Sequence, residues 1–211
     1  MVSINNKELK NLIEKNNPNL ILFGEAHGLL QETKIQEKIL EIFPCDVFMY
    51  ELLENQTLST KQEQENFLSK PDQEDFSIIS KNKDLKETVN LAKKFNLPLM
   101  GCDLENMGRK DTIFRERELT IEEQEEEKLM KKRELVQFEK INKQLNSGKK
   151  VFASVGIYHT LPRSELIENL KDKKVLIVYP IFKEGEIFGY KQEFDLEEVV
   201  YTTKSIQEYL K

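Results

Sequence analysis

The sequence lacks the long apolar segments that mark membrane and exported proteins. Its longest apolar runs, residues 20–23 and 175–182, fall far short of the ~20 residues that a transmembrane helix requires. Its first ten residues are polar, so they lack the apolar core of a signal peptide. These features indicate a cytoplasmic protein without a membrane anchor.

Cysteine is also scarce, with two residues in the chain, which is typical of a protein from a reducing compartment. Cys45 begins one expected strand and Cys102 ends another, so in parallel strands their thiols lie at opposite edges of the sheet, roughly 16 Å apart. Because bridged cysteines need Cα atoms within about 7 Å of each other, we expect no disulfide.

The chain has no excess of positive charge. Its formal net charge of −6 argues against nucleic acid as the main partner, although a local basic pocket remains open. At 211 residues, without internal repeats or a low-complexity linker, the chain fits one domain (1–211) that is long enough to bury its own core.

Continuous apolar segments alternate with segments of helical periodicity. Strands are expected at 19–25, 46–53, 97–103, 150–158 and 174–182. Helices are expected between them, at 29–42, at 84–96, and after Thr160, which caps a helix with Pro162 in its first turn. Residues 55–80 predict short helices and loops. The C-terminal part predicts a hairpin through Gly185 to 187–194, a short strand at 198–204 and a final helix.

This alternation predicts an α/β fold with a mostly parallel sheet flanked by helices. Continuous apolar strands are typical of parallel sheets, which are covered on both faces. The C-terminal hairpin is expected to add antiparallel strands at one edge of that sheet.

One long helix stands apart from this alternation. Residues 120–123 have the form of a capping box, and the helix they begin is expected to end near residue 146. One face of this helix carries Leu135, Phe138, Ile141 and Leu145, but its acidic first half has little to bury. We therefore treat residues 116–147 as a charged embellishment, with a solvated face or a projecting arm as the simplest interpretation.

Residues that are costly to bury follow four of the expected strands. The four strand ends are Gly24-Glu25-Ala26-His27-Gly28, Tyr50-Glu51, Gly101-Cys102-Asp103 and Gly156-Ile157-Tyr158-His159. In a parallel sheet these ends share one edge, where open α/β folds bind ligands. Imidazole and carboxylate are the usual nitrogen and oxygen ligands of divalent metals, which predicts a metal site made by His27, His159, Glu25, Glu51 and Asp103. A free carboxylate there would act as general base on a bound water.

Each of these residues also has a purely structural interpretation. A histidine at a strand end is often a satisfied turn residue, Glu25 suits the first turn of a helix, Glu51 suits an ion pair, and Asp103 suits a turn or a cap. A shared site is favoured because the chain has just two histidines, and each closes a Gly-x-x-His after an expected strand.

The ordered motifs resemble those of the superfamily that contains the TraB/Tiki proteins, ChaN and the erythromycin esterases. Its members share a Gly-x-x-His after the first strand, a glutamate after the next strand and a second Gly-x-x-His late in the domain. The resemblance covers residues 19–182. It implies that His27 and His159 are the catalytic or metal-ligand pair. It also implies that Glu25 and Glu51 act as metal ligand or general base, and that Arg109 or Arg115 contacts the substrate or an oxyanion.

Three functions are compatible with this pattern. The leading hypothesis is a metal-dependent hydrolase of the TraB/Tiki type that acts on a peptide, ester or other acyl bond of a small-molecule or peptide substrate. Its metal would be manganese, cobalt, zinc or iron(II). The first alternative is a ChaN-type protein that binds haem or a metal without turnover, through Tyr50, Tyr158 or the histidines. The second is an interaction protein with a structural site. A homo-oligomer is compatible with all three.

Overall fold

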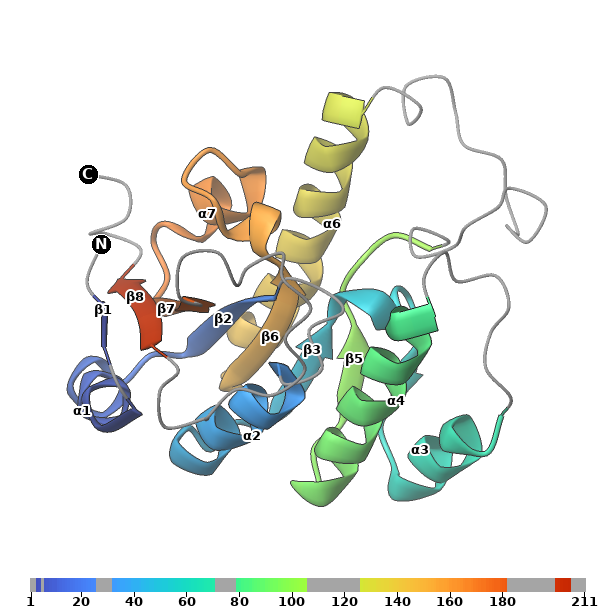
Figure 1. Cartoon of the computed structure of the whole chain (residues 1–211). Helices are drawn as coiled ribbons and strands as arrows, with labels where there is room; N and C mark the ends of the chain where they lie inside the picture. Colours follow the sequence, from blue (N-terminus) through green and yellow to red (C-terminus); the bar gives the residue numbers. More distant parts are fainter. Residues whose placement is uncertain are drawn as a thin grey trace.

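The structure, a computed structural model, describes residues 3–4, 6–25, 32–70, 79–105, 126–181 and 200–205 (Figure 1). Within these ranges the strands are β1 (Ser3–Ile4), β2 (Leu20–Glu25), β3 (Val47–Tyr50), β4 (Thr57–Leu58), β5 (Leu99–Gly101), β6 (Val151–Gly156), β7 (Val175–Ile181) and β8 (Val200–Ser205). The helices are α1 (Asn6–Asn16), α2 (Glu32–Ile42), α3 (Lys61–Leu68), α4 (Ile79–Lys94), α6 (Glu126–Asn146) and α7 (Glu165–Leu170). Two 3-10 turns matter for the site, η1 (Glu51–Leu53) and η3 (Ile157–Thr160).

The described strands form one sheet in the order β1-β8-β7-β2-β6-β3-β5-β4. Its centre is parallel: β2 pairs with β6 and β7, and β3 pairs with β5 and β6. At the two edges β8, β1 and β4 pair antiparallel with their neighbours. The inner strands β2, β3 and β6 are buried along their whole length, as continuous apolar strands in a covered sheet are. The predicted α/β class, with a mostly parallel sheet and an antiparallel pair near the C-terminus, is confirmed.

Helices cover both faces of the sheet (Figure 1). Side chains alternate between the two faces of a strand, so each inner strand contributes to two apolar layers. One layer joins α1, α2 and α4 to strand residues such as Phe23, Phe48 and Phe152. The other joins α6 and α7 to strand residues such as Leu22 and Met49. The sheet is therefore a rigid, fully packed support for the residues at its ends.

The segment after β6 differs from the expectation. β6 ends at Gly156 rather than at residue 158, and η3 follows it directly. Thr160 does not cap the next helix, because its hydroxyl donates to the carbonyl of Ile157 at 2.7 Å inside η3. The cap is Ser164, whose Oγ accepts from the backbone N–H of Ile167 at 3.1 Å. A Ser or Thr oxygen can satisfy such an N–H at either position, so the sequence alone does not decide between them.

Helix α6 packs on the sheet, with Ile141 fully buried and Phe138 against the same layer. Leu135, which was expected on this face, is 43% exposed. The buried face instead runs through Glu134, Gln137, Ile141 and Gln144. The inward face of α6 is therefore rotated relative to the predicted one, and its first half carries polar side chains into the protein.

Several features remain outside the predictions or outside the described residues. The apolar periodicity of the sequence does not predict α1, β1 or β4; β4 lies where short helices and loops were expected. The capping box at 120–123, the hairpin through Gly185 and the final helix lie outside the described residues, as does most of the acidic stretch before α6. Cys45 and Cys102 are both free thiols. No helix in the described ranges is both long enough and apolar enough to cross a membrane.

Candidate functional site

The four strands that carry the motifs are consecutive neighbours in the sheet. They lie in the order β2, β6, β3, β5, with Glu25 opposite Gly156 and Tyr50 opposite both Ser154 and Gly101. Because these strands run parallel, their carboxyl ends meet along one edge of the sheet, which we call the carboxyl edge. This is the place where open α/β sheets bind ligands.

At the carboxyl edge, Arg133 of α6 lies between two carboxylates. Its Nε donates to the Asp103 oxygens at 3.2 and 2.9 Å, and its Nη2 donates to Asp103 Oδ2 and Glu51 Oε1. Glu51 is 4% exposed and Asp103 is 1% exposed. Buried carboxylates are tolerated when they are paired and hydrogen bonded, and Arg133 pairs with both of them.

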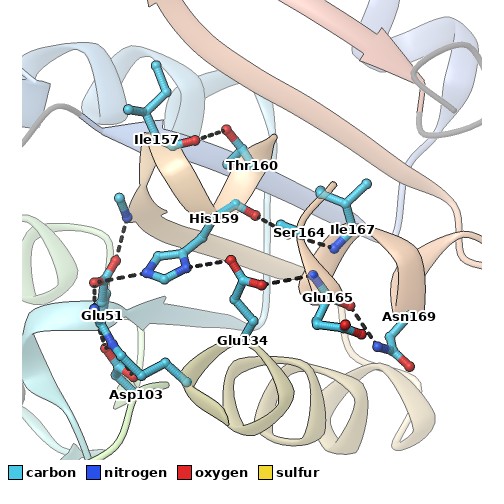
Figure 2. A network of polar contacts seen from close by, with 12 residues as sticks. Glu51, Asp103, Glu134, Ile157, His159, Thr160, Ser164, Glu165, Ile167 and Asn169 are labelled. Carbon is cyan, nitrogen blue, oxygen red and sulfur yellow. Dashed lines mark hydrogen bonds and ion pairs between the residues drawn. The ribbon is translucent and has the colours of Figure 1, made fainter. Parts of the chain in front are cut away.

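His159 of η3 lies between two carboxylates as well (Figure 2). Its Nδ1 is 3.1 Å from Glu134 Oε1, and its Nε2 is 3.5 Å from Glu51 Oε1. The remaining oxygens bind the backbone: Glu51 Oε2 accepts from the N–H of Gly156, and Glu134 Oε2 accepts from that of Glu165 at 2.8 Å. The contacts therefore continue from β5 through η3 to α7. We call Glu51, Asp103, Arg133, Glu134 and His159 the edge network.

The charges of the edge network are set by these contacts. Burial alone would lower the pKa of His159, but hydrogen bonds to Glu134 and Glu51 outweigh it and raise that pKa to about 9. Burial raises the pKa of Asp103, and the Arg133 guanidinium opposes this change. Burial would lower the pKa of Arg133, but Asp103 and Glu51 raise it above its ordinary value. At neutral pH His159 is thus an imidazolium that can donate from both ring nitrogens.

Glu25 has a different set of described partners. Its Oε2 accepts from the Ser154 hydroxyl at 2.6 Å and from Gln36 Nε2 at 3.0 Å. Gln36 belongs to α2, whereas Arg133 and Glu134 belong to α6 on the other face of the sheet. The structure therefore brings Glu51, Asp103 and His159 into one network and places Glu25 in a second polar cluster on the α2 side.

The two tyrosines named as haem-binding candidates have opposite environments. Tyr50 is 1% exposed and lies in the apolar layer beside Phe48, with ring centroids 6.4 Å apart. Tyr158, in η3 next to His159, is 69% exposed. A bound molecule at the carboxyl edge can therefore reach Tyr158 directly, whereas Tyr50 acts as a core residue.

His27, Arg109 and Arg115 lie outside the described residues. Their predicted roles as metal ligand, catalytic residue or substrate contact stay predictions. The predicted proximity of His27 and His159, on which the shared metal site depends, also stays a prediction.

In the described part of the chain, the predicted metal ligands contact other protein groups. No group of three or more His, Cys, Asp or Glu side chains among the described residues is arranged to hold a metal ion. Arg133 binds oxygens of Glu51 and Asp103, and His159 lies between Glu51 and Glu134. The metal-ligand roles of Glu25, Glu51, Asp103 and His159 therefore stay predictions.

Two members of the edge network, Arg133 and Glu134, were not among the predicted site residues. A signal for Glu134 exists in the sequence, because it stands one heptad before Ile141, at the spacing that returns to the same face of a helix. A charged residue at an inward position of a helix is unusual unless it is paired. The prediction followed Leu135 instead, one residue away.

Comparison with known proteins relates this architecture to a solved structure. No protein-family model and no curated protein sequence matches the chain. Among solved structures, it is similar to one that shows cofacial haem binding to ChaN of Campylobacter jejuni, with 16% identity and a TM-score of 0.52. The match covers 94% of this chain and 91% of that chain. The chain has the ChaN fold. The match extends over almost the whole of both chains, so the similarity to ChaN concerns the overall fold.

Proposed function

We propose that this protein binds haem at the carboxyl edge of its sheet, with Tyr158 as the ligand to the iron. The observation that carries the proposal is the fold shared with haem-binding ChaN over nearly the full length of both chains. The location follows from the rule that open α/β sheets bind ligands at this edge. Haem binding without turnover was the first alternative to the hydrolase in the sequence analysis.

Tyr158 suits an iron ligand because its phenol is accessible. Bound ferric haem would supply an iron centre that accepts an axial oxygen donor, a role that tyrosine fills in some haem proteins. Tyr158 is 69% exposed, so a bound haem can reach it.

The same segment also offers a positive charge. Arg163 is exposed and lies five residues after Tyr158, between η3 and α7. Haem carries two propionate groups, and arginine is well suited to bind carboxylates. We assign Arg163 this role as part of the proposal.

A haem titration tests the proposal. Ferric haem added to the wild-type protein should give a saturable shift of the Soret band, together with the charge-transfer band of an iron–phenolate bond. Tyr158→Phe keeps the ring but removes the oxygen, so it should weaken binding at least tenfold and abolish the charge-transfer band. Tyr50→Phe is the matched control and should bind haem as the wild type does. Equal binding by Tyr158→Phe would assign the ligand elsewhere, and the absence of a Soret shift in the wild type would overturn haem binding.

The metal-dependent hydrolase remains a prediction without support from the shared fold. It can be assayed on the same preparation with peptide, ester and lactone substrates and added manganese, cobalt, zinc or iron(II). Metal-dependent turnover that is lost in His159→Ala, in a protein that binds no haem, would favour the hydrolase over the proposed function.

A further inference from the structure

Glu134 joins α6 to two other elements with one side chain. It is 4% exposed, and both of its carboxylate oxygens are used. Oε1 lies 3.1 Å from Nδ1 of His159 in η3, and Oε2 accepts the backbone N–H of Glu165, the first residue of α7, at 2.8 Å. Figure 2 shows Glu134 between the imidazole ring and the start of α7. A buried side chain with two such contacts holds the elements it joins in register.

The position requires two acceptors, which explains why the residue is a glutamate. A carboxylate accepts at both oxygens, whereas a glutamine accepts at one oxygen and donates from its nitrogen. At position 134 a glutamine could serve either His159 or the N–H of Glu165, and its amide nitrogen would then face the other donor. An unmet buried donor is costly.

Glu51 holds the other end of the same segment. Its Oε2 accepts from the N–H of Gly156, the last residue of β6, and its Oε1 lies 3.5 Å from Nε2 of His159. Residues 156–165 are thus held at both ends by carboxylates, and both carboxylates also contact the one imidazole between them. Within the segment, the Ser164 hydroxyl donates to the carbonyl of His159 at 2.7 Å. Tyr158 lies inside this doubly held segment.

We propose that Glu134 is a positioning residue, which fixes His159 and η3 from α6 and so sets how Tyr158 is presented at the carboxyl edge. The effect of Glu134 on Tyr158 rests on the proposed haem binding. The effect of Glu134 on His159 follows from their hydrogen bond and from the contact between Glu134 and α7. No contact between Glu134 and a ligand is implied.

The test compares variants of Glu134 with a control on the same helix. Glu134→Gln keeps the size of the side chain and removes one acceptor, Glu134→Asp keeps both acceptors with a shorter reach, and Glu139→Gln changes an exposed glutamate of α6. In haem-free protein, proton NMR at neutral pH should show slowly exchanging imidazole N–H signals from His159, with His27→Gln used to assign them. Glu134→Gln should lose the Nδ1–H signal, and Glu139→Gln should keep it. If Glu134→Gln does not fold, Glu134→Asp is measured instead, and its Nδ1–H signal should be shifted relative to that of the wild type.

The haem-bound proteins provide the second measurement. The charge-transfer band should shift in Glu134→Gln and stay in place in Glu139→Gln. A lower melting temperature in Glu134→Gln with unchanged imidazole signals would overturn the proposal and leave Glu134 a purely structural role. If the wild type binds no haem but Glu134→Gln loses the Nδ1–H signal, the proposed function fails while the positioning of His159 stands.

Discussion

At the scale of single residues, the edge network is a set of buried charges that compensate one another. The network contains three carboxylates, a guanidinium and an imidazolium. Each of these groups lies within hydrogen-bonding distance of another member, from the end of β5 to the start of α7. Each group is tolerated because of its partners, since an isolated buried charge would be strongly unfavourable. Removing one member therefore changes the charge balance of the others. Functional sites often contain groups whose pKa values are displaced by such neighbours.

Replacing Arg133 should destabilise the protein strongly. Arg133→Met keeps much of the side-chain length but leaves Glu51 and Asp103 buried without their cation, which typically costs about 3–5 kcal/mol. Lys132→Met changes the exposed neighbour on the same helix and should stay within about 0.5 kcal/mol of the wild type. Urea unfolding monitored by circular dichroism measures both. A loss below about 1 kcal/mol in Arg133→Met would contradict the importance of the pairing.

The protonation of His159 should make stability depend on pH. Its pKa is about 9 in the folded protein and 6.5 for an ordinary histidine. Below about pH 6.5 both the folded and the unfolded protein bind this proton, so the stabilisation is fully present. As the pH rises through 9 the folded protein loses the proton, and the stabilisation, on the order of 3 kcal/mol, is lost.

The measurement is the difference in unfolding free energy between the wild type and His159→Gln across pH 6 to 10. This difference should shrink as the pH rises, while contributions common to both proteins cancel. A difference that stays constant over this range would mean that His159 is neutral in the folded protein at neutral pH.

At the scale of elements, the inner strands could be predicted because continuous apolar runs such as residues 20–23 leave few alternatives. The carboxyl edge could be predicted too, because glycine and charged residues follow four such runs. The inward face of α6 could not, because Glu134 and Gln137 are polar and the apolar periodicity pointed to Leu135. Burial of Glu134 depends on His159 and on α7, which are distant in sequence.

The turn after η1, which follows Glu51, closely approaches strand β5, which precedes Asp103. A Cβ atom on Gly101 would lie 2.2 Å from the carbonyl oxygen of Glu54, a backbone atom that cannot move aside easily. Gly101→Ala should therefore destabilise the protein by about 1–3 kcal/mol or more. Gly148→Ala is the control: its φ of +82° is strained for alanine but its Cβ meets no atom within 4 Å, so about 1 kcal/mol is expected. A smaller loss in Gly101→Ala than in Gly148→Ala, measured by thermal unfolding, would contradict this packing.

At the scale of the whole molecule, one parallel sheet gathers residues from distant parts of the chain at a single edge. β2, β6, β3 and β5 are neighbours in space although β6 follows β5 only after α6. The same fold is found in ChaN with 16% identity, so the architecture persists while most side chains differ. Fold alone does not specify function, so the proposed haem binding is tested at Tyr158 and at the contacts that hold its segment.

A crystal structure of the protein soaked with ferric haem would show directly whether haem binds at the carboxyl edge. We expect haem there, against η3, with its iron bonded to the phenolate oxygen of Tyr158 and with Glu134 still bound to His159. Haem bound at another place, iron bonded to another residue, or crystals without haem after soaking with saturating haem would contradict it.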